Sequence, residues 1–530
     1  MKIVVVGDIG WKDLYHLGDE AMTDAAIELL RARGITDITV TGGTPDIAAD
    51  FYQVPAVSRI GFVGRWSRAR MEARLAQLDE ELASFIDDAG EAKDAITAIS
   101  RADAVLIAGG GNLNSRHVQH MFERVSMVRI AKHFGKPVAL TSQTIGPDIV
   151  DGDRALLQEI LDYAVLIGAR ESDTRSLLLR LGVDPSKVHH CMDDALMLTA
   201  SDADHAAVEQ YVSDRYVIGS FAGHAKGTHL DDDEYYRLLA MQLDSLGDRY
   251  DARVLLVPHA GSLHDDRRRH DIGTHEEILR RSRSGRLEAL PMITARQLVA
   301  LTKGATLTLS SRYHPAVFGP SAGVPSLTVV PSYYSSVRMR GALRNVGLEG
   351  FAMPVDAVES GTMESILVDI DANRQSFTDH MSTTVAARKA EQNVWWDAIV
   401  DVLRGEGHTL VPTGDVPSWT EGLSWNAPLK AVFSVTHRLW EEERRGREQR
   451  AHSAETAIAA DSALEAARRT EGDLRNELKL ANERGDLAEA GIAERGRIIR
   501  SLRRQLTEER SRRLVRVADA VTSLKRALKR

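Results

Sequence analysis

The sequence contains almost no cysteine: Cys191 is the only one among 530 residues. A chain with a single cysteine cannot form an intrachain disulfide framework, and this fits a reducing compartment. Long hydrophobic runs are missing too. The apolar run near the start, Ile3–Val6, is followed by Gly-Asp and is too short for a signal peptide or a membrane span. We therefore expect a cytoplasmic protein.

The sequence also lacks an excess of positive charge. It has 67 Lys and Arg against 76 Asp and Glu, which gives a formal net charge of −9. We therefore expect no nucleic-acid partner, because such partners are polyanions. What the chain does have is the composition of ordinary soluble protein, with 43% hydrophobic and 27% charged residues, and a length that predicts more than one domain.

Short β-branched segments alternate with longer helical patterns along residues 1–200. Their apolar residues do not alternate strictly with polar ones, which is typical of parallel strands that are buried on both faces. This pattern predicts a doubly wound, Rossmann-like α/β domain over residues 1–200. Its strands are expected at Ile3–Val6, Ile38–Thr41, Ala104–Ala108, Pro137–Thr141 and Val165–Ile167.

The same alternation resumes after residue 214 and predicts a second Rossmann-like domain over residues 201–374. Its strands are expected at Tyr216–Phe221, Val254–Pro258, Leu287–Leu290, Ala305–Leu309 and Ser326–Val330. Residues 375–404 have the spacing of a helix that packs back on the first domain. Residues 405–436, rich in Gly, Pro, Ser and Thr, indicate a linker.

Residues 437–530 have the composition of a helical tail. Apolar residues at steps of 3 and 4 indicate a coiled-coil seam, through which the chain could form a homo-oligomer. Residues 494–530 hold thirteen Arg or Lys against four Asp or Glu. This charge fits either a solvated helix face or a peripheral contact with an anionic membrane or a partner. The seam residues are Ile499, Leu502, Leu506, Leu514, Val517, Val521, Leu524 and Leu528.

Polar and glycine-rich loops follow several predicted strands of the first domain. The carboxyl ends of such strands face the ligand crevice in open α/β sheets. Asp8 or Asp19 could contact a sugar hydroxyl or act as a base, although Asp19 could also be a helix N-cap. The loop Gly109-Gly110-Gly111-Asn112 precedes a predicted helix, so its backbone is either an anion site or a tight turn.

Two further strand ends could add to the same crevice. Gln143 follows one predicted strand, and Arg170 follows the next. An arginine at a strand end can bind a carboxylate bidentately, but Arg170 could instead pair with Glu171 at the next helix. Neither Gln143 nor Arg170 indicates a function on its own.

The segment Ser311-Arg312-Tyr313-His314 ends a predicted strand of the second domain. Arg312 supplies fixed positive charge there, while His314 can exchange a proton near neutral pH. His259 and Tyr334 end neighbouring strands and are expected to line the same cleft. Arg338 follows Tyr334 at helical spacing and could help to bind an anion. No motif has the usual spacing of zinc ligands, so we expect no metal site.

Taken in order, five motifs resemble the polysaccharide pyruvyl transferase family. They are Gly18-Asp19-Glu20-Ala21, Gly109-Gly110-Gly111, Gln143-Thr144-Ile145-Gly146-Pro147, Arg170-Glu171-Ser172 and Ser311-Arg312-Tyr313-His314. The resemblance implies a fold of two Rossmann-like domains similar to GT-B glycosyltransferases, and phosphoenolpyruvate as donor. It also implies a glycan or lipid-linked sugar as acceptor. Many relatives have a lysine where this chain has Val337-Arg338.

The family reaction gives the candidate residues chemical roles. His314 is the candidate general acid, Arg312 stabilises charge, and Asp19 is the candidate base. Arg170, Arg338, Ser311, Gln143 and the Gly109–Asn112 loop are expected to bind the donor, without a cofactor. Two alternatives remain open: a nucleotide-sugar-dependent glycosyltransferase on the same fold, and a non-catalytic scaffold for glycan assembly.

Overall fold

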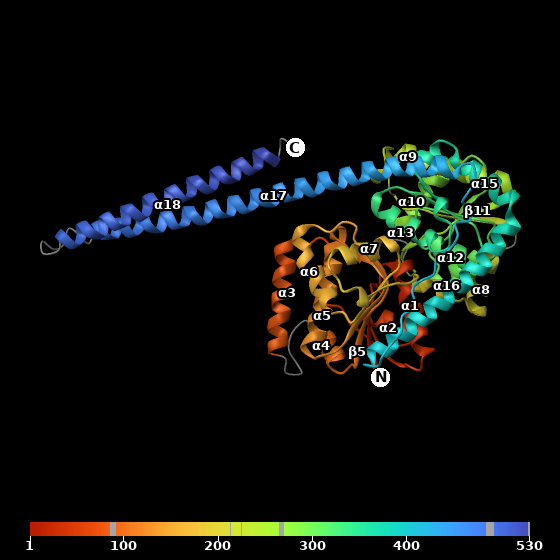
Figure 1. Cartoon of the computed structure of the whole chain (residues 1–530), viewed down its shortest axis with the longest axis horizontal. Coiled ribbons are helices and arrows are strands. Elements are labelled where there is room, and N and C mark those ends of the chain that lie inside the picture. The colour runs from red at the N-terminus through yellow and green to blue at the C-terminus, as the bar shows by residue number, and fades with distance from the viewer. Residues whose placement is uncertain (85–91, 213, 224, 264–269, 484–491, 528–530) are drawn as a thin grey trace. The chain divides into compact units, whose positions relative to one another are not determined.

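A computed structural model describes residues 1–84, 92–212, 214–223, 225–263, 270–483 and 492–527 (Figure 1). The chain separates into two compact units, Met1–His437 and Arg438–Arg530. The first unit holds two α/β lobes with a parallel sheet each, which confirms the predicted fold class.

The first lobe is built on a parallel sheet with the strand order β4-β3-β1-β5-β7-β8-β9, and β6 is added beside β7. Apolar side chains from α3, α4, α5 and α6 form one buried core with the strands. The strands are β1 (Lys2–Val6), β3 (Asp37–Gly42), β4 (Ala56–Ser58), β5 (Ala104–Ile107), β6 (Gly110–Leu113), β7 (Val138–Ile145), β8 (Leu166–Ala169) and β9 (Val188–His190). The helices are α1 (Leu17–Arg31), α2 (Pro45–Tyr52), α3 (Arg68–Ala83), α4 (Lys93–Ser100), α5 (Val118–His133), α6 (Asp151–Tyr163) and α7 (Ser172–Arg180).

The second lobe repeats this plan with the strand order β13-β11-β10-β14-β15-β16. Its strands are β10 (Tyr216–Ser220), β11 (Arg253–Leu256), β13 (Leu287–Ala289), β14 (Thr308–Ser310), β15 (Ser326–Val330) and β16 (Ala352–Pro354). Its helices are α8 (Asp202–Val208), α9 (Asp232–Tyr250), α10 (His270–Arg281), α11 (Ala295–Lys303), α12 (Pro315–Ser321), α13 (Tyr333–Arg344), α14 (Val355–Glu359) and α15 (Thr362–Ala372).

Main-chain hydrogen bonds join the two lobes directly. β2 (Tyr15–His16) of the first lobe pairs with β12 (Ala260–Gly261) of the second as a short antiparallel ribbon. Beside it, the Leu17 amide donates to the carbonyl of His259 at 2.9 Å. The loop before α1 is thereby fixed against the end of a second-lobe strand.

The long helix α16 (Arg374–Leu403) returns from the second lobe to the first (Figure 1). The Trp396 indole donates to Asp194 at 2.7 Å and the Trp395 indole to Thr141 at 3.1 Å. Both tryptophans are fully buried. Their contacts hold α16 against the first lobe, in the place that the sequence predicts for a helix over residues 375–404.

The segment between α16 and the tail differs from the linker expected over residues 405–436. The helix α17 (Asn426–Glu483) begins before His437. Its first turns pack on the second lobe, where Leu429 and Phe433 are buried. Pro428 falls in the first turn of α17, where a helix tolerates proline because the amide there needs no helical partner. The proline-rich composition therefore conceals the start of this helix.

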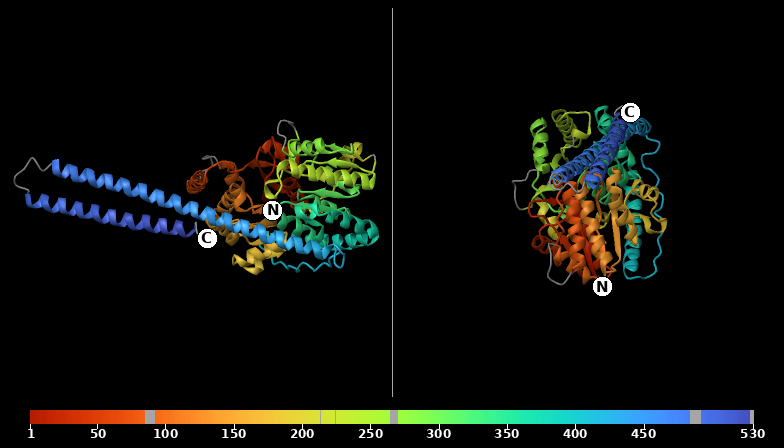
Figure 2. Two further views of the ribbon diagram at one scale, coloured as in Figure 1. Left: turned by 90° about the horizontal axis from the view of Figure 1, so that it is seen from above. Right: turned by 90° about the vertical axis from the view of Figure 1, so that its left-hand side faces the viewer.

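The second unit is a helical hairpin, in which α18 (Ile492–Ala527) runs beside the later part of α17 (Figure 2). Glu471 of α17 pairs with Arg513 at 2.7 Å and with Arg510 at 3.3 Å. Leu514 and Val521 of the predicted seam are exposed, and Leu528 lies outside the described residues. Among the described residues, no helix has an apolar stretch long enough to cross a bilayer.

Candidate functional site

Loops from both lobes enclose a cavity of about 110 Å³ in the first unit. The first-lobe side of its lining comes from β2, the start of α1, the first half of β6 and the end of β8. The second-lobe side comes from the ends of β11 and β14 and from α13. The lining residues are His16, Gly18, Asp19, Met22, Gly111, Arg170, His259, Ser311, Arg312, Tyr313, His314 and Arg338.

Arginines from the two lobes meet at Gly111. A side-chain carbon on this glycine would lie 3.1 Å from Nη2 of Arg170 and 3.1 Å from Nη1 of Arg338. It would also lie 3.0 Å from the Tyr334 hydroxyl, which donates to the Gly111 carbonyl. A side chain at this position would press into the space that the two guanidinium groups share, and these groups would have to shift by a few tenths of an ångström.

The three cavity arginines differ in how far their charge is already neutralised. Arg170 pairs with Asp193 at 2.7 Å and with Glu171 at 3.0 Å. Arg312 pairs with both carboxylate oxygens of Asp271. Among the described residues, no carboxylate forms an ion pair with Arg338.

Instead of a carboxylate, Arg338 contacts aromatic rings. Its guanidinium lies 4.1 Å from the ring centre of Tyr334 and 5.6 Å from that of Tyr313. Such contacts orient a guanidinium group without cancelling its charge. Arg338 is therefore the cation of this cavity that is best able to attract an anion.

His314 occupies the space that the missing side chain of Gly18 leaves at the start of α1. A side-chain carbon on Gly18 would come within 2.2 Å of the imidazole. Burial, and then Arg170 and Arg338, hold the pKa of His314 well below its usual value of 6.5. Its Nε2 is buried without a hydrogen-bond partner among the described residues. A buried polar atom of this kind is costly unless a ligand supplies its partner.

Two more neutral groups present unpartnered polar atoms in the cavity lining. Burial lowers the pKa of His259 to about 3, while its Nδ1 lies 2.6 Å from the Ser220 hydroxyl. Burial raises the pKa of Tyr313 well above 10. The Nε2 of His259 and the hydroxyl of Tyr313 have no hydrogen-bond partner among the described residues. The cavity thus combines positive charge with neutral hydrogen-bonding groups.

The two aspartates near α1 lie in different electrostatic environments. Burial, and then the charge of Asp8, raise the pKa of Asp19 to about 6. Burial would also raise the pKa of Asp8, but nearby basic groups, Arg59 foremost, outweigh it and lower that pKa. Asp8 is thus held as a carboxylate by Arg59, whereas Asp19 lines the cavity and can change its protonation state near neutral pH.

Several predicted site residues do not line the cavity. Gln143 lies inside β7, which extends to Ile145, and its amide donates to the carbonyls of Ala108 and Thr141. Asp8 is turned toward Arg59. Gly109, Gly110 and Asn112 also lie outside the lining.

The glycine-rich loop does not lead straight into a helix. Residues Gly110–Leu113 form the strand β6, and α5 begins only at Val118. The strand β6 thus separates these glycines from the amides at the start of α5, and an anion site on those amides stays a prediction. A glycine run after a strand does not distinguish an added strand from the start of a helix.

Two residues that were not predicted as site residues, His16 and Met22, also line the cavity. Met22 lies one turn after Gly18 on α1, and its sulfur contacts Nη1 of Arg170 at 3.2 Å. The helical spacing of Gly18, Asp19 and Met22 is the signal that could have identified it. His16 precedes the helix, and its position depends on the ribbon with the second lobe.

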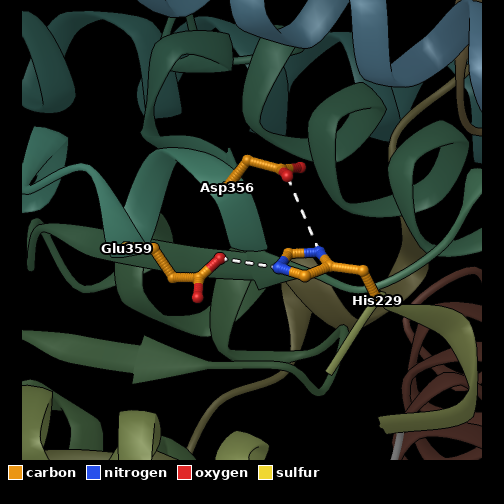
Figure 3. Close-up of side chains that lie close together, drawn as sticks. All are labelled: His229, Asp356 and Glu359. Atoms are coloured by element: carbon orange, nitrogen blue, oxygen red, sulfur yellow. Dashed lines mark ion pairs between the residues drawn. The ribbon is translucent and has the colours of Figure 1, made fainter. Parts of the chain in front are cut away.

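A group of metal-binding residue types lies outside the cavity lining (Figure 3). His229, Asp356 and Glu359 are all exposed. Nδ1 of His229 faces Asp356 at 3.6 Å, and Nε2 faces Glu359 at 2.9 Å. Because the ring lies between the two carboxylates, a single ion could bind only one of its nitrogens. This geometry suits a polar link between the loop after β10 and α14 better than a metal site.

Comparison with solved structures finds the same fold at low sequence identity. A UDP-N-acetylglucosamine 2-epimerase matches with a TM-score of 0.50 and 12% identity, covering 78% of this chain and 99% of its own. An MnaA-UDP structure from S. aureus gives a TM-score of 0.49 at 12% identity, with 78% and 99% coverage. HepE from Anabaena in complex with UDP gives 0.47 at 13% identity, with 76% and 100% coverage.

Comparison of the sequence with curated proteins gives no match. The family model described as polysaccharide pyruvyl transferase, however, matches residues 16–333, which is more than half of the chain. The matched region begins at His16 and includes every cavity residue except Arg338. The chain therefore belongs to the polysaccharide pyruvyl transferase family.

Proposed function

We propose that this protein transfers pyruvate from phosphoenolpyruvate to two hydroxyls of a glycan or lipid-linked sugar, forming a ketal and releasing phosphate. The observation that carries the proposal is the meeting of Arg170 and Arg338 at Gly111. Phosphoenolpyruvate carries a carboxylate and a phosphate, and guanidinium groups bind both through charge-assisted hydrogen bonds. The Tyr313 hydroxyl is an additional donor for its oxygens.

The reaction requires a proton at the methylene carbon of the donor. His314 supplies it as general acid, and the adjacent carbon then accepts the oxygen of the first sugar hydroxyl. Asp19, in the first turn of α1, takes the proton from that hydroxyl. The oxygen of the second hydroxyl displaces phosphate from the same carbon, and the leaving phosphate takes the proton of that hydroxyl. Run in D2O, the reaction is expected to leave one deuterium in the new methyl group.

A general acid must carry a proton, so the low pKa of His314 in the free protein has to rise when the donor binds. Burial, and then Arg170 and Arg338, disfavour its protonated form. When an anionic donor pairs with these arginines, their repulsion of the imidazolium is offset and the pKa of His314 rises. Donor binding therefore shifts His314 toward its protonated form. Transfer of this kind contributes about 10²–10⁴-fold to a rate.

The size of the cavity favours a small donor over a nucleotide sugar. A volume of about 110 Å³ is below the roughly 300–1,000 Å³ of sites for drug-sized ligands. We expect millimolar phosphoenolpyruvate to raise the melting temperature of the full chain, because a ligand that binds only the folded state stabilises it. UDP- and GDP-sugars are expected to leave it unchanged. Stabilisation by a nucleotide sugar alone would favour a glycosyltransferase.

The pH dependence of turnover tests the role of Asp19. Burial, and then Asp8, raise the pKa of Asp19 to about 6. Above this pH Asp19 is a carboxylate and can accept a proton, and below it this capacity is lost. At saturating phosphoenolpyruvate, where the bound donor has raised the pKa of His314, we therefore expect kcat/KM for the acceptor to fall about tenfold per pH unit below pH 6. Asp19→Asn should lower the rate and remove this acid limb. If kcat/KM of Asp19→Asn still falls below pH 6 as before, the group that titrates there is not Asp19.

A further inference from the structure

The second unit carries an apolar strip on α18 that its own hairpin leaves uncovered. Leu514 is 72% exposed and Val515 is 59% exposed. By contrast, Ile499, Leu502 and Leu506 earlier on the same helix are partly buried. Neighbouring exposed aliphatic side chains of this size are unusual on a solvated helix and indicate an interaction surface.

Basic residues lie in line with both of these side chains. Eleven residues make about three turns of an α-helix, so residues eleven apart lie on the same side. Leu514 is therefore in one row with Arg503 and Lys525, and Val515 is in the next row with Arg504 and Arg526. All four basic residues are exposed. Of these, Arg504 pairs with Glu508 at 3.1 Å.

The charge of this part of α18 is strongly one-sided. Residues 512–527 include five basic residues and one acidic residue, Asp519. A second copy of the same face would bring like charges together, which opposes α18 pairing with itself. An anionic lipid surface complements both features, because it attracts Lys and Arg and accepts apolar side chains at the headgroup boundary.

From this pattern we propose that the strip formed by Leu514 and Val515, with Arg503, Arg504, Lys525 and Arg526, binds an anionic bilayer surface peripherally. The strip is short, so this binding is reversible. It lies on the second unit and does not depend on the reaction proposed for the cavity. If the proposed reaction also holds, binding through this strip keeps the enzyme at the membrane surface, where lipid-linked saccharides are found.

Vesicle co-sedimentation of the full chain tests the proposal. We expect binding to vesicles of phosphatidylcholine and phosphatidylglycerol in equal amounts, and none to phosphatidylcholine alone. Raising the salt from 0.1 to 0.5 M should weaken binding, because it screens surface charge. The double variant Leu514→Asp and Val515→Asp should weaken binding by about tenfold or more.

A matched control separates the apolar strip from charge in general. Ser501→Asp with Gln505→Asp adds the same two charges at other exposed positions of α18 and should weaken binding far less. Circular dichroism checks that both variants keep their helix. Equal losses in the two variants, equal binding to both vesicle types, or no binding would overturn the proposal. A dimer would overturn it too, if light scattering shows twice the mass of one chain and the double variant Leu514→Asp and Val515→Asp returns the mass to that of a monomer. The strip would then join two copies of the chain.

Discussion

Replacing Arg338 by alanine is expected to raise KM for phosphoenolpyruvate about 100-fold, the equivalent of two charge-assisted hydrogen bonds of about 1.5 kcal/mol each. Arg338 has no carboxylate partner among the described residues, so the variant leaves no buried acid unpaired and should remain folded. Arg338→Lys should recover part of the affinity, because lysine restores the charge without the planar fork. Steady-state phosphate release at saturating acceptor measures both effects.

Arg340 provides the matched control. It lies two residues further along α13, and its guanidinium stacks 4.7 Å from the ring centre of Phe433, outside the cavity lining. Arg340→Ala removes the same charge from the same helix and should leave KM for phosphoenolpyruvate unchanged. If both variants weaken donor binding equally, Arg338 acts only through the general charge of the lobe.

Replacing His314 by glutamine is expected to lower kcat by about 10²–10⁴-fold, because glutamine can hydrogen-bond but cannot deliver a proton. Binding of phosphoenolpyruvate should persist, since the arginines remain. Two measurements on His314→Gln test this role. Phosphate release should be lost, and adding phosphoenolpyruvate should still raise the melting temperature.

The exposed His205 on α8 gives a comparison for this substitution. His205→Gln should turn over at the rate of the unchanged protein. Full activity of His314→Gln would remove the imidazole from the chemistry and leave proton delivery to another group. Loss of both activity and donor-induced stabilisation would mean that His314 shapes the cavity and does not act as its acid.

The sheets were predictable because their strands are continuous apolar runs. The predicted strands Ile3–Val6 and Ser326–Val330 differ from β1 and β15 by at most one residue. The second half of β7 was not predictable from the sequence. Thr141 to Thr144 are polar residues, and their side chains are buried and hydrogen-bonded inside the lobe. Periodicity detects apolar burial, and polar burial leaves no such pattern.

The candidate site was predictable to the extent that strand ends converge. Arg170, Arg312 and His314 lie in one cavity because each follows a parallel strand. Their partners could not be predicted in the same way. Asp271 is 41 residues from Arg312. Only the fold shows that it neutralises this arginine, whereas no carboxylate in the described part of the chain pairs with Arg338.

The ribbon of β2 and β12 has a consequence for how sequences of this architecture can diverge. It joins the lobes through amides and carbonyls, which every residue except proline provides in full. Most substitutions within the ribbon therefore leave these main-chain bonds in place. This part of the link between the halves can persist in relatives whose sequences differ, while side-chain links such as Arg296 to Asp24 depend on both residues.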